Sequence, residues 1–273
     1  MATTRIGLDQ LPPAARAAIE QHTGPLLTVK ETTEGFNSEI AARVTSTSGT
    51  WHIKGLRTDH PRAWTQHREA TIAPFLTGLA PTLHWHVETA GWDLLGFEAL
   101  NGHHADYTPG SPDLPEVAAL LRHLGETPCP DIELRHAEQR LERYAARPDG
   151  LRHFAGPHLL HTDLNNTNVL VDGYAPQGNR ARLVDWAWAT RGAAWLDAGY
   201  WVIWLIAAGH TPASAEHWAT DIPSWHTAPT EGITAFATAN ANMWAEISNA
   251  DPSPWTFHLA AAAEAWRTHR MDR

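Results

Sequence analysis

Four polar residues have types and spacings that suit metal-assisted chemistry. His161, Asp163 and Asn168 lie in the sequence HTDLNNTN, which precedes an apolar run over 169–171, and Asp185 follows a second apolar pair. Each alone has a simpler explanation, because aspartate and asparagine are common in polar loops and turns. Together they offer more, because Mg²⁺ prefers carboxylate and amide oxygens and a carboxylate can accept a proton from a hydroxyl group.

This pattern resembles the aminoglycoside phosphotransferase and choline kinase family, a branch of the protein-kinase-like superfamily. The family signature is HxDxxxxN followed by a strand and an aspartate, and both halves are present here. Phosphoryl transfer needs a carboxylate near the attacking hydroxyl and oxygen ligands for Mg²⁺. The resemblance implies that Asp163 orients the acceptor hydroxyl and takes its proton, and that Asn168 and Asp185 bind magnesium. It also implies that His161 braces the loop.

The first part of the chain offers an independent check on this resemblance. The fold needs a lysine on the third strand to hold the α- and β-phosphates, and a glutamate on the following helix to hold that lysine. Lys54 lies in the third strand-like run and Glu69 lies within the next helical segment. Exposed lysines and glutamates are usually solvated surface, but here each occurs in the element that the resemblance requires.

The predicted phosphate loop and hinge have weaker signatures. In the sequence TEGFNSE, Gly35 allows close approach of the backbone to phosphate, and Asn37 and Ser38 offer donors. An ordinary hairpin turn explains the same residues. At the end of the fifth strand-like run, the backbone groups of Glu98 and Leu100 match the position at which the family binds the purine of ATP or GTP.

The residues after Asp185 depart from the protein-kinase pattern. The sequence there is Asp-Trp-Ala-Trp instead of Asp-Phe-Gly. Small-molecule phosphotransferases frequently have Asp-Trp at this position, so Trp186 fits that branch and argues against a protein kinase. The resemblance gives Asp197 a structural role, bracing the catalytic loop from the start of the next helix.

Two lobes are predicted to position these residues. Strand-like runs occur over 26–32, 40–47, 50–56, 81–88 and 92–100, with helical segments over 11–22 and 59–79. Beyond residue 102, helical patterns cover 116–124, 132–146 and most of the chain after 195, with breaks near prolines 212, 223 and 252. We therefore predict an α+β, bilobal protein-kinase-like fold. Residues 1–100 form a small antiparallel β N-lobe with one inserted helix, and residues 101–273 form a larger, mainly α-helical C-lobe.

Composition excludes several classes of function. The formal net charge of −10 argues against a nucleic-acid-binding protein. The strongly apolar run 201–208 is far shorter than the roughly 20 residues that span a bilayer, and residues 1–10 contain no signal-peptide core. The single cysteine, Cys129, cannot form an intrachain disulfide. We expect a cytoplasmic protein, a monomer or weak homodimer, without a nucleic-acid or membrane partner.

The acceptor is the least defined part of the prediction. A cationic small molecule with a hydroxyl group, such as an aminoglycoside, suits the acidic chain, and a role in antibiotic resistance would follow. Trp188 is the predicted cation–π contact for this acceptor. Acidic side chains of the helical half are further candidates, although a solvated helix face explains them equally well: Glu216, Asp221, Glu231, Glu246, Asp251 and Glu264.

Two other functions remain open from the sequence. The same core serves metabolic kinases of choline, sugars or amino-alcohols, and fold-level analogy does not choose among them. A nucleotide-binding pseudokinase with a regulatory role is the alternative from a different class, which the unorthodox phosphate loop favours and the complete set of polar residues opposes.

Overall fold

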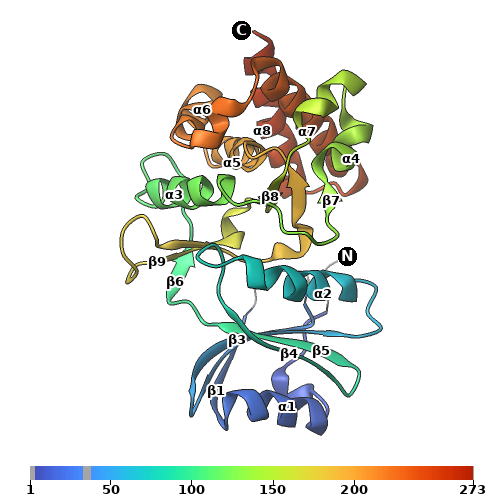
Figure 1. The fold of residues 1–273 in the computed structure, drawn as a ribbon, viewed down its shortest axis with the longest axis vertical. Helices are drawn as coiled ribbons and strands as arrows, with labels where there is room; N and C mark the ends of the chain where they lie inside the picture. Colours follow the sequence, from blue (N-terminus) through green and yellow to red (C-terminus); the bar gives the residue numbers. More distant parts are fainter. Residues whose placement is uncertain (1–3, 33–37, 273) are drawn as a thin grey trace. The chain divides into compact units, whose positions relative to one another are not determined.

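The chain forms two compact units. The computed structural model describes residues 4–32 and 38–272. Unit 1 comprises Met1–Gly102 together with Arg182–Ala187, and unit 2 comprises His103–Ala181 together with Trp188–Arg273 (Figure 1). The short segment 182–187, which carries Asp185, thus belongs to the same unit as the first hundred residues.

Unit 1 is built on a five-stranded antiparallel sheet in the order β1-β2-β3-β5-β4. Two-residue turns join β2 to β3 and β4 to β5, whereas α2 lies in the connection between β3 and β4. At Ala90 and Gly91, which join β4 to β5, the φ angles of 50° and 78° are the left-handed pair that a tight hairpin turn requires. The elements of this unit are α1 (Pro13–Thr23), β1 (Leu26–Glu31), β2 (Ile40–Ser46), β3 (Gly49–Arg57), α2 (Ala63–Ile72), β4 (Leu83–Thr89) and β5 (Trp92–Glu98).

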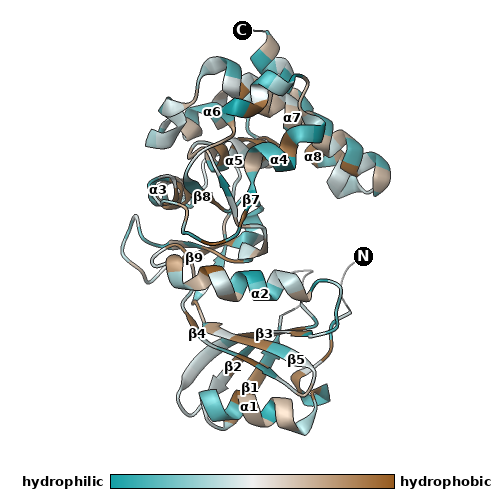
Figure 2. Ribbon diagram, turned by 45° about the vertical axis from the view of Figure 1, so that its right-hand side comes forward, coloured by the Kyte–Doolittle hydropathy of each residue, from teal (hydrophilic) through white to brown (hydrophobic). Residues whose placement is uncertain are grey.

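The two faces of this sheet differ in character. Helices α1 and α2 lie on opposite faces (Figures 1 and 2). Ile19 of α1 packs in an apolar core with Val44, Ile53 and Leu94 of the strands. Because side chains alternate along a strand, the neighbours of these residues point to the α2 face. That face therefore carries His52 and Lys54, on either side of Ile53.

Gly96 lets a tryptophan lie flat on the sheet. It pairs across the strands with Trp85, whose ring stacks on His22 of α1 at 5.0 Å between centroids. A Cβ atom on Gly96 would lie 2.0 Å from Cε2 of the Trp85 ring. The absence of a side chain at this position is therefore a packing requirement.

Unit 2 contains the remaining helices and two small sheets. The sheets have the orders β10-β9-β6 and β7-β11-β8. The strands are β6 (Gly102–His104), β7 (Arg135–His136), β8 (His158–Leu160), β9 (Val169–Asp172), β10 (Ala181–Leu183), which runs into the segment of unit 1, and β11 (Thr190–Gly192). The helices are α3 (Leu114–Gly125), α4 (Ala137–Leu141), α5 (Leu196–Ala207), α6 (Pro212–Thr220), α7 (Thr230–Ala250) and α8 (Pro254–Met271).

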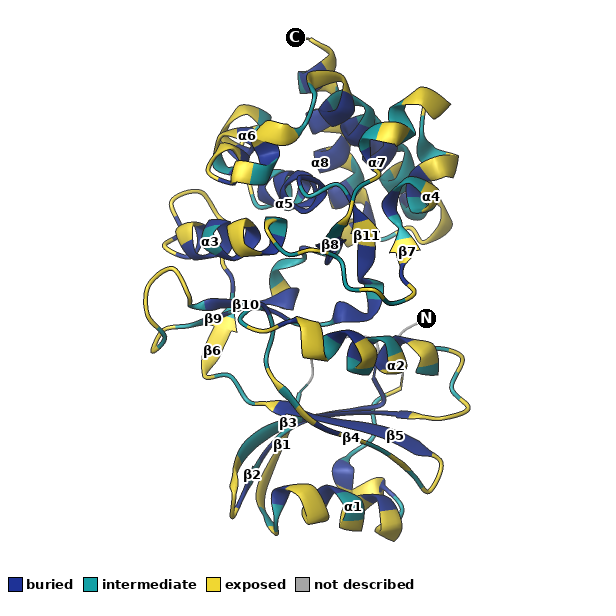
Figure 3. Cartoon of the chain, viewed as in Figure 1, coloured by how far each residue is buried: buried dark blue, intermediate teal, exposed yellow. Residues whose placement is uncertain are grey.

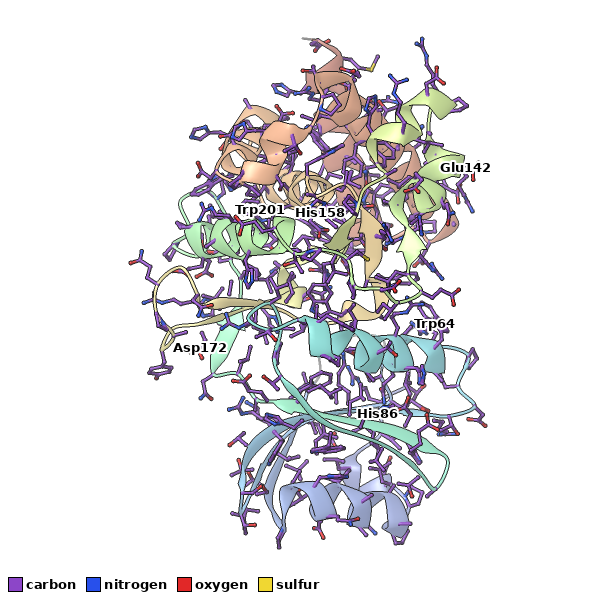
Figure 4. All side chains as sticks on the ribbon, viewed as in Figure 1. Trp64, His86, Glu142, His158, Asp172 and Trp201 are labelled. Atoms are coloured by element: carbon purple, nitrogen blue, oxygen red, sulfur yellow. The ribbon has the colours of Figure 1, made fainter. Side chains whose placement is uncertain are left out.

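Aromatic rings form the centre of unit 2, where α5 and α7 pack with α8. Phe236 of α7 is fully buried, and its ring lies 4.9–6.1 Å from those of Phe154, Trp195, Tyr200 and Trp266. Figure 3 shows α5 as the most continuously buried helix. Trp195, Trp201 and Trp266 are buried in this core, whereas Trp255 is exposed; Figure 4 labels Trp201.

Most predicted elements are present, and the α+β fold class is confirmed. The breaks at the prolines are correct: Pro212 begins α6 after the Thr211 cap, and a Ser253–Thr256 capping box starts α8. The helix predicted over 132–146 is wrong, because this segment forms β7, the short helix α4 and a 3₁₀ turn at Glu142–Tyr144. At the start of the segment, β7 pairs with β11, so these residues form a strand although their pattern favours a helix. The predicted helix 59–79 ends early, at Ile72, before a 3₁₀ turn at Ala73–Phe75 that contains Pro74.

No helix among the residues 4–32 and 38–272 combines the length and the apolar character that crossing a membrane requires.

We expect Gly96→Ala to destabilise the protein by about 1–3 kcal/mol, because the new methyl group must displace a buried indole ring. Urea unfolding followed by circular dichroism measures this change. Gly173→Ala is the matched control, since a Cβ atom there meets nothing within 4 Å, and it should stay within about 0.5 kcal/mol of the wild type. Equal stability of the two variants would show that Trp85 does not depend on the missing side chain.

Candidate active site

A buried lysine organises the polar residues of unit 1. Nζ of Lys54, on β3, lies 3.0 and 2.8 Å from the two carboxylate oxygens of Glu69, on α2, and also contacts Oδ1 of Asp185. Lys54 and Glu69 are 9% and 7% exposed. The structure therefore brings together three of the predicted residues, from a strand, a helix and the segment 182–187.

The electrostatics of this group keep Lys54 charged. Burial by itself would lower the pKa of the Lys54 ammonium, but the carboxylates of Asp185 and Glu69 outweigh burial and raise that pKa above its ordinary value. A buried cation without such partners would be strongly destabilising. The lysine therefore remains a positive charge in the folded protein.

The backbone around Asp185 is unusual. Its φ angle is 64°, in the left-handed region that non-glycine residues rarely adopt. The next residue, Trp186, is buried, and its indole Nε1 donates to the Leu183 carbonyl at 3.1 Å. This anchor holds the turn whose geometry aims the Asp185 carboxylate at Lys54.

A second buried charge organises the predicted catalytic loop in unit 2. Asp197, in the first turn of α5, accepts hydrogen bonds from the backbone N–H groups of His161 and Thr162, each at 2.8 Å. Burial raises the pKa of the Asp197 carboxyl, and these two hydrogen bonds oppose the shift. The geometry is that of the loop-bracing role that the resemblance implies for Asp197.

The loop itself is tightly built. Thr162 has a φ of 68°, and its hydroxyl accepts from Arg140 Nη1 at 2.6 Å. His161 is fully buried, and its Nδ1 accepts from the Asp163 N–H at 3.3 Å, which fits a bracing role. Strained backbone of this kind persists only where the surroundings enforce it, and it clusters at functional sites.

Asn168 lies close to Asp163 in this loop. Its Nδ2 donates to the Asp163 carbonyl at 3.1 Å, within a 3₁₀ turn at Asn166–Asn168 that the Asn165 side chain caps. Because the amide nitrogen is engaged, the amide oxygen is the group that remains for a metal. An asparagine oxygen here and the Asp185 carboxylate in unit 1 are chemically suitable Mg²⁺ ligands.

The hinge and the phosphate loop are described only in part. The Glu98 N–H donates to the Thr82 carbonyl at 2.8 Å, and the Leu100 carbonyl accepts from Arg43 Nη1 at 2.6 Å. Ser38 is buried next to Glu39. Gly35 and Asn37 lie outside the described residues, so their predicted role stays a prediction.

Trp188 contacts cations that belong to the chain itself. The guanidinium groups of Arg135 and Arg140 lie 5.0 and 5.6 Å from the centre of its ring. The ring can therefore bind cations, and two guanidinium groups already contact it. Its predicted contact with an acceptor stays a prediction, in which the acceptor must compete with these arginines.

Several acidic candidates have other partners. Glu216 is buried and accepts from Trp266 Nε1 at 2.8 Å and from Arg270 Nη1, which ties α6 to α8. Glu246 pairs with Arg143, and Glu264 pairs with Arg267. Of the six acidic candidates, the exposed residues Asp221, Glu231 and Asp251 remain.

Sequence reasoning missed three residues beside these groups. Burial, followed by the charge of Lys54, lowers the pKa of His52 to about 4. Burial, followed by the charge of Asp163, raises the pKa of Tyr107 well above its ordinary value. Arg140 bonds to Thr162 and also to the Trp188 carbonyl. His52 could have been identified from the sequence, because it is two residues from Lys54 on the same strand and so lies on the same face. Tyr107 and Arg140 come from segments with no motif.

Unit 2 also contains a cavity of about 500 Å³. His153, His158, Trp195 and Ser224 are among the residues that line it, and none of the predicted site residues does. Figure 4 labels His158. This cavity is therefore distinct from the predicted catalytic loop.

The fold matches solved kinase structures at low sequence identity. Choline kinase LicA from Streptococcus pneumoniae matches with a TM-score of 0.63 and 13% identity, covering 93% of this chain and 99% of that chain. The GDP complex of aminoglycoside 2'-phosphotransferase-IIIa matches at 0.61 and 11%, covering 93% and 98%. A thermostable aminoglycoside phosphotransferase APH(4)-Ia mutant, in complex with ADP and hygromycin B, matches at 0.58 and 13%, covering 91% and 97%.

No protein-family model and no curated protein matches the sequence. The chain nevertheless has the fold of aminoglycoside phosphotransferases and choline kinase. The resemblance inferred from the motif is thus confirmed at the level of the fold.

We expect His52 to make the protein less stable as the pH falls. Its pKa in the folded protein is about 4, against an ordinary value of 6.5. The unfolded chain therefore binds the proton first, so stability is complete above pH 6.5 and decreases as the pH falls towards 4, by roughly 3 kcal/mol at most. Urea unfolding of wild type and His52→Gln at pH 7 and pH 4.5 measures the difference. Identical pH dependence of both proteins would contradict the assignment.

Proposed function

We propose that this protein is a small-molecule O-phosphotransferase that moves the γ-phosphoryl group of ATP or GTP to a hydroxyl of a cationic acceptor. The observation that carries the proposal is the buried Lys54 with its two carboxylate partners, Glu69 and Asp185. Burying a lysine with two carboxylates has a high desolvation cost, which offsets much of their attraction. Stability alone therefore does not explain this arrangement, and a function does. The fold shared with choline kinase and aminoglycoside phosphotransferases supports this choice.

Each polar residue has a role in this reaction. Lys54, held by Glu69, binds the α- and β-phosphates. Asp163 orients the acceptor hydroxyl and accepts its proton while the oxygen attacks the γ-phosphorus and the nucleoside diphosphate leaves. Asn168 and Asp185 hold Mg²⁺, which neutralises the charge of the phosphates when it is bound. His161 and Asp197 keep the loop in place for Asp163.

The hinge can recognise a purine through its backbone. The base edge of adenine offers one donor and one acceptor, so it requires one carbonyl and one N–H. The Glu98 N–H and the Leu100 carbonyl already have partners. The Glu98 carbonyl and the Leu100 N–H are therefore the groups that bind the base.

A cationic acceptor is supported by charge. The chain has a formal net charge of −10, and clefts of one sign attract substrates of the other. The APH(4)-Ia structure contains the aminoglycoside hygromycin B, and choline is another cation. A test should therefore include aminoglycosides, choline, amino-alcohols and amino sugars, with neutral sugars for comparison.

The reaction can be tested directly by incubating the protein with Mg²⁺, ATP or GTP and each acceptor, and by measuring products by mass spectrometry. We expect one acceptor to gain a single phosphoryl group. Nucleotide binding without transfer to any acceptor or to water would favour the regulatory pseudokinase, and no Mg²⁺-dependent nucleotide binding would contradict the proposal.

Asp163→Asn should lower kcat by at least about 100-fold while nucleotide still binds, because the proton acceptor is removed and the metal ligands remain. Steady-state kinetics on the acceptor identified above measures this effect. Asp149→Asn, at an exposed position of unit 2, is the control and should keep wild-type kcat. Near-complete activity of Asp163→Asn would rule out its role.

Asp185→Asn should weaken Mg²⁺-dependent nucleotide binding by roughly tenfold or more, equal to about 1.4 kcal/mol, and should lower turnover as well. The carboxylate is both the predicted metal ligand and a partner of Lys54. Titration calorimetry with and without Mg²⁺ separates the two effects, because loss of the metal ligand alone removes only the Mg²⁺-dependent part of the affinity. Unchanged Mg²⁺ dependence would exclude Asp185 as a ligand.

A further inference from the structure

Two carboxylates face each other across the strands of unit 1. Glu88 on β4 and Asp93 on β5 are direct cross-strand partners. Asp93 is only 3% exposed, so its charge is poorly solvated. Like charges directly opposite each other in a sheet destabilise it. A cation at this point would remove the repulsion.

A histidine from α2 completes a set of three ligands. One ligand atom each from His67, Glu88 and Asp93 lies within 4.8 Å of the other two. Among the described residues this is the only group of three or more His, Cys, Asp or Glu side chains close enough to share one ion. It is separate from the predicted Mg²⁺ ligands, Asn168 and Asp185.

His86 supports the same group from the next position along the strand face. Its Nε2 lies 2.8 Å from Oδ1 of Asp93, and because a carboxylate only accepts, the imidazole is the donor. The rings of His86 and His67 are 6.2 Å apart, edge to face. Figure 4 labels His86. A hydrogen bond that fixes a ligating carboxylate is what metal sites commonly have outside their ligands.

We propose that His67, Glu88 and Asp93 form a binding site for a divalent transition metal of the zinc class, with His86 orienting Asp93. One nitrogen and two oxygens match a three-ligand zinc site whose fourth position is open to water. The nitrogen ligand disfavours Mg²⁺ and Ca²⁺, which prefer oxygen. The proposal does not depend on the proposed phosphotransferase activity.

The geometry requires only a small adjustment. Zinc bonds to nitrogen and oxygen of about 2.0–2.2 Å place ligand atoms roughly 3.5 Å apart in a tetrahedron, so the metal would draw the three groups together by about 1 Å. His67 and Glu88 are exposed, so their side chains can move. The buried Asp93, held by His86, is the fixed point.

The site would join α2 to the β4–β5 hairpin. His67 lies two residues before Glu69, the partner of Lys54, on the same helix. Gln66 Nε2 also contacts the Asp93 backbone carbonyl, so this turn of α2 already rests on β5. Bound metal would therefore stabilise the position of the helix that carries Glu69.

The test is titration of the metal-free full chain with Zn²⁺ in the presence of millimolar Mg²⁺, by calorimetry and by thermal unfolding. We expect one equivalent to bind and to raise the melting temperature. His67→Ala and Glu88→Gln, both at exposed positions, should abolish this binding, and His86→Ala should weaken it about 10- to 100-fold.

His217→Ala removes an exposed histidine of α6 instead and should bind Zn²⁺ as the wild type does, which controls for the 18 histidines of the chain. Substitution by Co²⁺ should give the absorption bands of a four-coordinate ion in wild type and none in His67→Ala. The proposal is overturned if no Zn²⁺ binds, or if one equivalent still binds unchanged to both His67→Ala and Glu88→Gln.

Discussion

The ammonium group of Lys54 is buried, and much of unit 1 follows from the need to compensate it. Little water reaches the charge, so carboxylates compensate it, and both come from outside the sheet: Glu69 from α2 and Asp185 from residues 182–187. The helix therefore packs on the lysine face of the sheet, and a segment distant in sequence becomes part of the unit. An isolated buried charge is costly, whereas a well-bonded one fixes the orientation of every group around it.

Unit 2 also contains a buried charge that is compensated by its neighbours, but here the charge is negative. The carboxylate of Asp197 is buried, and it is satisfied by two backbone N–H groups at His161 and Thr162. These bonds hold the loop where Thr162 takes a positive φ, and Asp185 of unit 1 has the same kind of backbone. Apart from Ala90 in a hairpin turn, these are the non-glycine residues with positive φ in the described chain. In each case a buried ion bonds within one residue of the strained position, so the charges enforce the strain.

The sequence indicated those residues whose position in an element is diagnostic. Lys54 and Glu69 were predicted because a strand and the helix after it could be recognised from local patterns, and the structure pairs them. The helix predicted over 132–146 is wrong because two residues of this segment pair with β11, a strand far along the chain. Sequence analysis did not identify Tyr107 and Arg140 for the same reason: tertiary packing brings them next to Asp163 and Thr162. The arginines that face Trp188 likewise have no local signal.

The alternation of side chains along three strands explains why unit 1 has one inert face and one chemical face. On β3, Ile53 enters the apolar core with α1, while His52 and Lys54 point to the other side. On β5, Leu94 enters the core and Asp93 does not; on β4, Val87 packs against the core while His86 and Glu88 point away. Lys54, Asp93 and Glu88 thus lie on the α2 face of the sheet. A helix with so few apolar contacts, only Ile72 being a buried aliphatic residue, is held by ions and hydrogen bonds. Its position, and with it that of Glu69, therefore depends on the charged and polar groups of this face.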